Sequence, residues 1–374
     1  MLESQISWRK VLLLFLAHQR AYSFIMCNMA TLYNQQWQQQ ELRERCGDMK
    51  QIAGCTRYRL QEGPERDVEI IDVRTGSGFR FQICPSRGMD IPFAEYNGRP
   101  LCWQSSTGVV HPGYYEKEKT GWLRGFNAGL LTTCGLSSFG GPNEDEGESY
   151  GLHDRISYIP ASQVNVEQQW TDESTFEIAI SGNLRQTRVF GPNLTLRRCI
   201  TTTAGSTFFT IDDTVTNEGF VPEPAVILYH CNFGFPVVSE DSRIVAPSLE
   251  QAPVGDFAAQ TQDSWDRMEA PQAGLAERCY AHQMKADENG MVRASIINEK
   301  IDFGACVEYR AKELPHFMQW KTMACGTYVT GLEPSNAPLK SRDVLRELGQ
   351  LTILQPGESW NFQVRLGVLE SSLH

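Results

Sequence analysis

Two runs near the middle of the chain, LTLRRCIT at residues 194–201 and TFFTIDDTVT at residues 207–216, are rich in β-branched and aromatic residues. Such runs, separated by stretches that contain Gly, Asn, Asp or Pro, are typical of short β-strands. Similar runs occur at residues 58–60, 68–73, 79–83, 100–103, 163–167, 175–180, 291–296, 305–309, 351–354 and 360–366. Clear helical patterns are few. The sequence therefore predicts an all-β protein, a large sandwich of two twisted antiparallel sheets.

The length of 374 residues and the hydrophobic content of 41% allow a large buried core. No shift in composition marks a linker, so we expect residues 29–374 to form a single domain. Residues 8–17 look like the start of a signal peptide, but their apolar run is too short for a membrane span and no convincing cleavage site follows. We interpret residues 1–28 as an upstream extension or a poorly ordered tail.

Charge and cysteine content limit the partners and the compartment. A net charge of -11 argues against binding to nucleic acid or to an anionic membrane, because phosphate binding needs a basic surface. The eleven cysteines include no CxxC pair. This pattern favours free thiols in a reducing compartment over a disulfide framework, and we expect a cytoplasmic protein. The oligomeric state is not predicted.

A glutamate and a histidine lie at the ends of two strand-like runs about a hundred residues apart. Glu333 occurs in GLEPSNAP at residues 331–338, where two prolines stiffen the backbone, as suits a positioned general base. A solvated turn glutamate is the alternative. His230 occurs between apolar residues in ILYHCNFGFP at residues 227–236, with Asn232 as a further candidate for ligand contact. We expect Glu333 and His230 to meet across one sugar-sized cleft.

A second histidine is predicted to bind a polyol. His153 and Arg155 precede the run ISYI at residues 156–159, which we expect to be a strand with both residues on one face. Imidazole and guanidinium groups both donate hydrogen bonds to hydroxyls. A structural ion pair with a nearby carboxylate is the equally supported alternative.

Four further residues are weaker candidates for binding. Arg87 is predicted in a turn with Asp90, where the two could contact ligand or form a buried pair that joins strands. Arg124 lies between aromatic residues that could stack on a sugar ring. Trp320 and Lys321 lead into the glutamate strand and could lie near the site.

Several of these motifs resemble those of a known family. LYHCNFG at residues 228–234 resembles the TNHxYFNL motif of aldose 1-epimerases (galactose mutarotases), and GLEPSNAP resembles their LETQNxPDA motif. GPN at residues 141–143 followed by GLH at residues 151–153 resembles NNGPNxLHGG with an insertion, although Asp154 replaces a glycine. The blocks SRGMDI, GLLTTCGL, GLHDRIS and YHCNFGFP are similar to the DUF4432 group of mutarotase-like proteins, and the similarity covers roughly residues 38–370.

The resemblance implies a β-supersandwich that acts on a small carbohydrate, a free sugar or a sugar acid, without a cofactor. In the family mechanism the glutamate takes the proton of the anomeric hydroxyl and the histidine protonates the ring oxygen, so the ring opens, C1 rotates and the ring closes on the other face. Carried over, Glu333 is the base, His230 the acid, and His153 a substrate ligand.

Three alternatives stay open at the level of sequence. The same acid–base pair could serve an isomerase, an epimerase at another carbon, or a lyase. The chain could instead be a carbohydrate-binding protein without catalytic activity. A metal site made of His153, His230 and Glu333 is a weaker option, because these residues lack ligand spacing, and we predict none.

Overall fold

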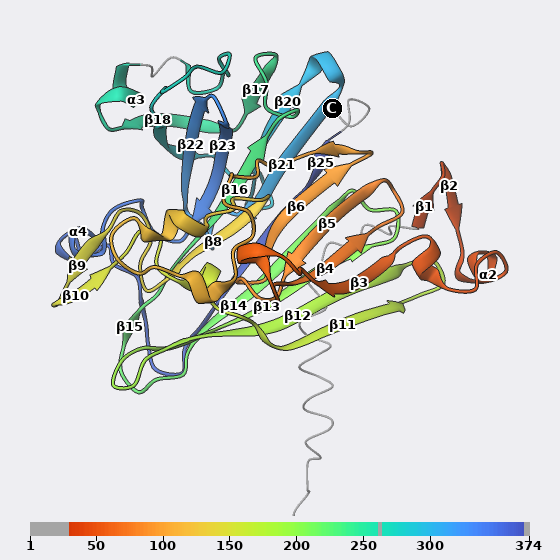
Figure 1. The fold of residues 1–374 in the computed structure, drawn as a ribbon, viewed down its shortest axis with the longest axis horizontal. Helices are drawn as coiled ribbons and strands as arrows, with labels where there is room; N and C mark the ends of the chain where they lie inside the picture. The colour runs from red at the N-terminus through yellow and green to blue at the C-terminus, as the bar shows by residue number, and fades with distance from the viewer. Residues whose placement is uncertain (1–29, 261–263, 370–374) are drawn as a thin grey trace, which may run out of the picture.

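The computed structural model describes residues 30–260 and 264–369, so the predicted extension at residues 1–28 lies outside the described residues. Two large antiparallel sheets confirm the all-β prediction. Figure 1 shows them as two layers, with the orange strands of one above the green strands of the other.

The first sheet has eight strands. Its order is β11 (Ser162–Trp170), β12 (Phe176–Thr187), β13 (Asn193–Thr203), β14 (Phe208–Asn217), β25 (Ser359–Leu369), β21 (Phe303–Arg310), β20 (Met291–Asn298) and β17 (Ser242–Val245). Strand β25 from the end of the chain lies between β14 and β21, which joins distant segments into one layer.

The second sheet has eleven strands. Its order is β18 (Ser248–Val254), β19 (Arg278–Met284), β22 (His316–Ala324), β23 (Thr327–Ser335), β16 (Val226–Gly234), β8 (Leu131–Leu136), β6 (Asp90–Tyr96), β5 (Phe79–Cys84), β4 (Glu69–Arg74) and β3 (Gly54–Arg59), with β7 (Arg99–Pro100) paired to β6.

Smaller elements connect and cover the two sheets. The short strands are β1 (Ala30–Leu32), β2 (Gln35–Trp37), β9 (Asn143–Asp145), β10 (Glu148–Tyr150), β15 (Glu223–Pro224) and β24 (Ile353–Leu354). The α-helices are α2 (Gln39–Arg43), α3 (Asp256–Gln260) and α4 (Arg342–Glu347). The 3-10 turns are η2 (Met49–Gln51), η3 (Gly63–Glu65), η4 (Pro112–Tyr114), η5 (Gly121–Gly125), η6 (Ile156–Tyr158) and η8 (Glu299–Ile301).

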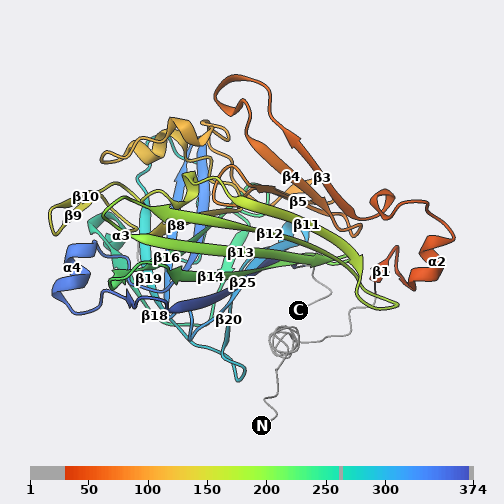
Figure 2. The same cartoon turned by 90° about the horizontal axis from the view of Figure 1, so that it is seen from below.

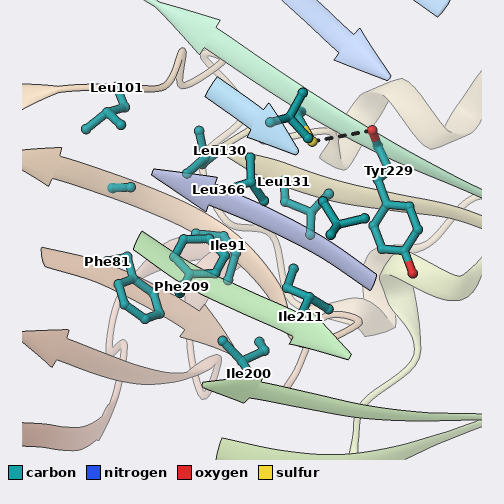
Figure 3. Close-up of a cluster of buried hydrophobic side chains, with 14 of the residues drawn as sticks. Phe81, Ile91, Leu101, Leu130, Leu131, Ile200, Phe209, Ile211, Tyr229 and Leu366 are labelled. Atoms are coloured by element: carbon teal, nitrogen blue, oxygen red, sulfur yellow. Dashed lines mark hydrogen bonds between the residues drawn. The ribbon is translucent and has the colours of Figure 1, made fainter. Parts of the chain in front are cut away.

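Alternating side chains explain how the sheets pack. In β13 and β14 every second residue is buried, because successive side chains of a strand point to opposite faces. Phe209 of β14 stacks on Phe81 of β5, with ring centroids 4.5 Å apart, and so joins one sheet to the other. Figure 3 shows these two rings among buried aliphatic side chains of both layers.

Strand β16 differs from β13 and β14 because all nine of its residues are buried. Tyr229 and Phe233 belong to the core between the sheets, and Leu228 belongs to a second apolar cluster on the opposite face. Trp122 and Phe126 from η5 and the residue after it contribute to that second cluster. The segment between β7 and β8, gold in Figures 1 and 2, thus lies beside β8 and β16 and covers the outer face of the sheet.

Candidate active site

His230 and Glu333 face each other on neighbouring strands. The register of β16 against β23 pairs Leu228 with Ser335 and Cys231 with Leu332, which places His230 opposite Glu333. Side chains directly opposite in an antiparallel pair are close neighbours. Nε2 of His230 lies 3.3 Å from Oε1 of Glu333, and the two side chains are 7% and 3% exposed. The structure brings the two residues together in direct contact, whereas we expected a sugar-sized cleft between them.

Aromatic rings surround this contact. The His230 ring centroid lies 5.3 Å from that of Trp320, 5.5 Å from that of Phe126 and 5.6 Å from that of His153. Trp103 meets Trp320 edge-on at 6.4 Å. The polar pair therefore lies in an apolar setting that lowers the local dielectric constant.

Burial favours the uncharged forms of both partners. It lowers the pKa of His230 to about 4 and raises the pKa of Glu333 well above its usual range. A carboxyl group that keeps its proton thus lies beside a neutral imidazole, at a 3.3 Å contact that does not have the geometry of a hydrogen bond. The pair can thus act as an acid and a base in the same event.

Three buried polar atoms at this pair lack a hydrogen-bond partner within the described residues. They are Nδ1 of His230, Oδ1 of Asn232 and Oε1 of Glu333. The Asn232 amide donates from Nδ2 to the carbonyl of His230 at 2.9 Å, so Asn232 lies beside the pair. Buried polar groups without partners are rare in folded proteins and are commonly satisfied by a ligand or by water.

His153 enters the site from a loop and not from a strand. Both His153 and Asp154 have left-handed backbone conformations, and the predicted strand after them is the turn η6, which is a correction to our prediction. Nδ1 of His153 accepts a hydrogen bond from the backbone N–H of Gly140 at 3.3 Å. In a neutral imidazole the proton is then on Nε2. Burial lowers the pKa of His153 to about 3, which favours this neutral form.

The Asp154 carboxylate holds the turn that carries His153. Its Oδ2 accepts from the amide of Gln186 at 2.7 Å and from the backbone N–H of Ser137 at 3.2 Å. These contacts tie the turn to both sheets, because Gln186 lies on β12 and Ser137 follows β8.

Three of the predicted arginines are engaged away from the His230–Glu333 contact. Arg87 is buried and donates from its three guanidinium nitrogens to the main-chain carbonyls of Ser157, Val110 and Gly125. Arg124 is 73% exposed and pairs with Glu116 at 2.9 Å. Arg155 is exposed, with its guanidinium 5.8 Å from the ring centre of Tyr115. Arg87 thus holds loops together, and its predicted pairing with Asp90 does not form.

Trp320 and Lys321, predicted together, point to opposite faces of β22. Trp320 contacts His230, whereas the Lys321 ammonium donates to the carbonyl of Ser264 at 2.8 Å and pairs with Glu269 at 3.1 Å. The reason is the two-residue period of a strand. Lys321 therefore does not lie at the His230–Glu333 contact.

The sequence interpretation missed the role of Gly331. The Glu333 carboxylate folds back along its strand, so that a Cβ at position 331 would overlap Oε1 of Glu333. Gly331 belongs to the GLEPSNAP motif, so its glycine was visible in the sequence, but its steric reason depends on the side-chain conformation of Glu333. The Gly140 N–H that fixes the His153 tautomer has no sequence signal.

Three further observations concern metals, membranes and thiols. Across residues 30–260 and 264–369, no three His, Cys, Asp or Glu side chains are grouped to hold a metal ion. No helix in that part of the chain is long and apolar enough to cross a bilayer. The described cysteines are free thiols and most of them are buried.

Comparison with solved structures identifies mutarotase-like relatives. A candidate aldose 1-epimerase from Klebsiella pneumoniae is 29% identical, with a TM-score of 0.81 over 85% of this chain and 84% of that chain. A galactose mutarotase-like protein from Clostridium acetobutylicum has a TM-score of 0.59 at 12% identity over 86% and 99% of the two chains. A galactose 1-epimerase from Lactobacillus acidophilus has a TM-score of 0.55 at 12% identity over 85% and 99%. A comparison with curated proteins gives no match.

These relatives establish the fold as galactose mutarotase-like, as the motifs predicted. The profile of one family, described as domain of unknown function DUF4432, matches residues 65–368. That range covers most of the chain and includes every residue of the site described above. The chain belongs to the DUF4432 family.

Proposed function

We propose that the chain is an enzyme of the aldose 1-epimerase type that interconverts the anomers of a free sugar, with Glu333 as base and His230 as acid. One observation carries this proposal: an imidazole and a carboxyl group lie 3.3 Å apart, buried among aromatic rings, with polar atoms that lack partners. The likeness to proteins described as epimerases and mutarotases supports it. The buried free thiols are compatible with a cytoplasmic enzyme.

The chemistry starts when the proton of the pair moves from the carboxyl group to the imidazole. Glu333 is then a carboxylate and His230 an imidazolium. The two oxygens of a hemiacetal are bonded to the same carbon and therefore lie close together. They can contact Glu333 and His230 at the same time, because these two groups are 3.3 Å apart. Glu333 accepts the proton of the anomeric hydroxyl, the bond between C1 and the ring oxygen breaks, and His230 gives its proton to the ring oxygen.

The open-chain aldehyde rotates about the bond between C1 and C2 before the ring closes. In closure the Glu333 carboxyl returns its proton to the carbonyl oxygen and His230 takes back the hydroxyl proton, which forms the carboxylate and the imidazolium again. The proton then moves back from the imidazolium to the carboxylate, and both groups regain their starting forms. The low dielectric constant of the aromatic surroundings strengthens the interactions with the transient charges.

Three neighbours provide the contacts that hold the sugar in this proposal. The Nε2–H of His153 donates to a hydroxyl, and Oδ1 of Asn232 accepts from one. Trp320 stacks on the apolar face of the ring. Arg155 is exposed, so in this proposal it contacts only a part of the substrate that extends outside the aromatic enclosure.

Anomer-resolved NMR exchange on dissolved monosaccharides tests the reaction directly. We expect the protein to accelerate exchange between anomers of at least one sugar. Glu333→Gln and His230→Asn should each lower turnover by about 10² or more, the usual scale of general acid–base catalysis. Glu116→Gln, which changes an exposed carboxylate that pairs with Arg124, is the control and should leave the rate unchanged.

The same experiment separates the remaining alternatives. An isomerase, an epimerase at another carbon or a lyase would produce new resonances, whereas anomer exchange produces none. A binding protein without activity would bind the sugar and leave the exchange rate at its spontaneous value. Normal turnover by either variant would contradict the assigned role of that residue.

A further inference from the structure

One exposed carboxylate is tied to the aromatic wall of the site. Nε1 of Trp320 donates a hydrogen bond to Oε2 of Glu277 at 2.8 Å. Glu277 lies two residues before Cys279, which pairs with Trp320 in the register of β19 against β22. Because the Trp320 ring contacts His230, the Glu277 carboxylate fixes the orientation of a ring that touches the catalytic pair.

The polar atoms left without partners indicate which ligand chemistry fits. Oδ1 of Asn232 is an acceptor, and Oε1 of Glu333 is an acceptor whenever that group is a carboxylate. A sugar hydroxyl can donate to such atoms. A carboxylate or phosphate offers only acceptor oxygens, which would face these two acceptors across a buried contact and could be matched only by the imidazoles of His153 and His230.

The charges near the site also disfavour an anion. Among the described residues no lysine or arginine forms an ion pair with Glu333 or with Glu277, and His230 is the only ion-pair partner of Glu333. Arg278, next to Glu277 in the sequence, and Lys321, next to Trp320, both pair with Glu269. Burial is the largest cause of the raised pKa of Glu333, and the negative charge of Glu277 is the second. The electrostatic field of Glu277 therefore reaches the Glu333 carboxyl group.

Other titratable groups around Glu333 do not supply a positive charge at neutral pH. Burial raises the pKa of the three thiols, which stay neutral. It lowers the pKa of the two imidazoles, which stay uncharged. These groups are Cys134 of β8, His230 and Cys231 of β16, Cys279 of β19 and His153 of the loop after β10.

We propose that Glu277 is a specificity-determining residue, which anchors the Trp320 indole and excludes sugars that carry a carboxylate or a phosphate. The substrate is then an uncharged aldose and not a sugar acid. This inference rests on the proposed function for the identity of the site, but it concerns which sugar is accepted and not which bond is broken.

Matched sugars and matched variants test this role. Each neutral sugar is compared with the acid that differs from it only at C6: glucose with glucuronic acid, galactose with galacturonic acid, and mannose with mannuronic acid. Anomer exchange and quenching of tryptophan fluorescence are measured for both members at low and at high ionic strength. Glu277→Gln keeps an oxygen that can accept from the indole and removes the charge, whereas Glu277→Ala removes both. Glu299→Gln is the control, since Glu299 is 70% exposed and pairs with Arg243.

We expect the wild-type protein to prefer the neutral sugar by about tenfold or more in kcat/KM, the scale of one unfavourable charge contact near a protein surface. Glu277→Gln should reduce that preference by about fivefold at low ionic strength and by less at high ionic strength, where surface charges are screened. Glu277→Ala should in addition raise KM for the neutral sugar, because Trp320 loses its anchor. Glu299→Gln should keep the wild-type preference.

The outcomes distinguish this inference from the proposed reaction. Suppose that the protein accelerates exchange of no sugar, yet binds the neutral sugar more tightly than its acid, with a smaller difference in affinity for Glu277→Gln. In that case the proposed reaction is wrong and the specificity role of Glu277 holds. An equal preference in wild type and Glu277→Gln at low ionic strength overturns the role of Glu277. Tighter binding of the acid by the wild type, or no binding of either member of any pair, overturns it as well.

Discussion

Strand β16 carries two buried polar clusters on its two faces, and they differ in how their hydrogen bonds are satisfied. We define the core cluster as Asp90, Thr133, Arg198, Asp213 and Tyr229, which lies between the sheets, and the site cluster as His230, Asn232 and Glu333, which lies on the outer face. In the core cluster, Arg198 donates to both carboxylate oxygens of Asp213 at 2.9 and 2.7 Å. In the site cluster, each residue keeps one polar atom without a partner.

The difference separates a structural role from the catalytic role that we propose. Tyr229 donates to Asp213 at 2.7 Å, and Arg198 also donates to Thr133 at 2.9 Å, so the core cluster is closed on itself. A closed network of this kind gives specificity to the packing of the two sheets and has nothing left to offer a ligand. The site cluster, one residue further along the same strand, keeps hydrogen-bonding capacity for a substrate at a cost in stability.

Removal of the core arginine should have the greatest effect on folding. Arg198→Met leaves the buried Asp213 carboxylate without its charged partner, so we expect a loss of about 3–5 kcal/mol in the free energy of unfolding. Urea unfolding of the variant and the wild type measures this loss. Glu333→Gln, which removes no closed network, should change that free energy by about 1 kcal/mol or less. Equal losses in the two variants would show that the clusters do not differ as described.

The pH dependence of stability tests the core cluster through Asp90. Burial raises the pKa of Asp90 from 3.8 to about 6 in the folded state, although Arg198 opposes this. The folded state then holds a proton that the unfolded state releases, so the stability contributed by this group falls as the pH rises from about 4 to about 6. Asp90→Asn has no carboxyl group to titrate at this position. Its free energy of unfolding, relative to that of the wild type, should therefore rise by about 2 kcal/mol over that range. Denaturation curves at pH 4 and pH 7 measure the gain, and a constant difference between the two proteins would refute it.

A small change in the site cluster should act on the reaction more than on the fold. Gly331→Ala places a Cβ where the Glu333 carboxylate now lies. Because a displaced catalytic group loses its alignment, we expect anomer exchange to fall about tenfold. Gly47→Ala, at a position with no heavy atom within 4 Å of the new Cβ, is the control and should exchange at the wild-type rate. An unchanged rate in Gly331→Ala would mean that the carboxylate position is not critical.

The fold was largely predictable because most of its strands have a recognisable local sequence pattern. Runs such as those of β13 and β14 combine β-branched residues with turn residues at their ends, and these signals do not depend on distant contacts. The run at residues 156–159 has the same composition, yet it forms the turn η6, since the left-handed residues before it redirect the chain. Tertiary context decided the conformation there.

Two motifs predicted that His230 and Glu333 lie near each other, with a cleft between them and not a direct contact. His153, Asn232 and Trp320 were also named from the sequence and lie beside His230, but other residues were misplaced. Lys321 was assigned to the site because its segment leads into the strand of Glu333, but strand alternation places its side chain on the other face. The sequence does not show that the guanidinium of Arg87 donates hydrogen bonds to three main-chain carbonyls from distant loops, so Arg87 was predicted as a ligand contact. Glu277 belongs to no recognisable motif. Its contact with Trp320 depends on the pairing of β19 with β22, which the sequence does not reveal.

The most direct test of the central claim, that His230 and Glu333 act as one unit, is a double-mutant cycle in anomer-exchange rates. If the pair shares one proton and acts in a single event, His230→Asn combined with Glu333→Gln should be no slower than the slower single variant. Losses that multiply in the double variant would mean that the two residues act independently, and the account of a joint acid–base pair would be wrong.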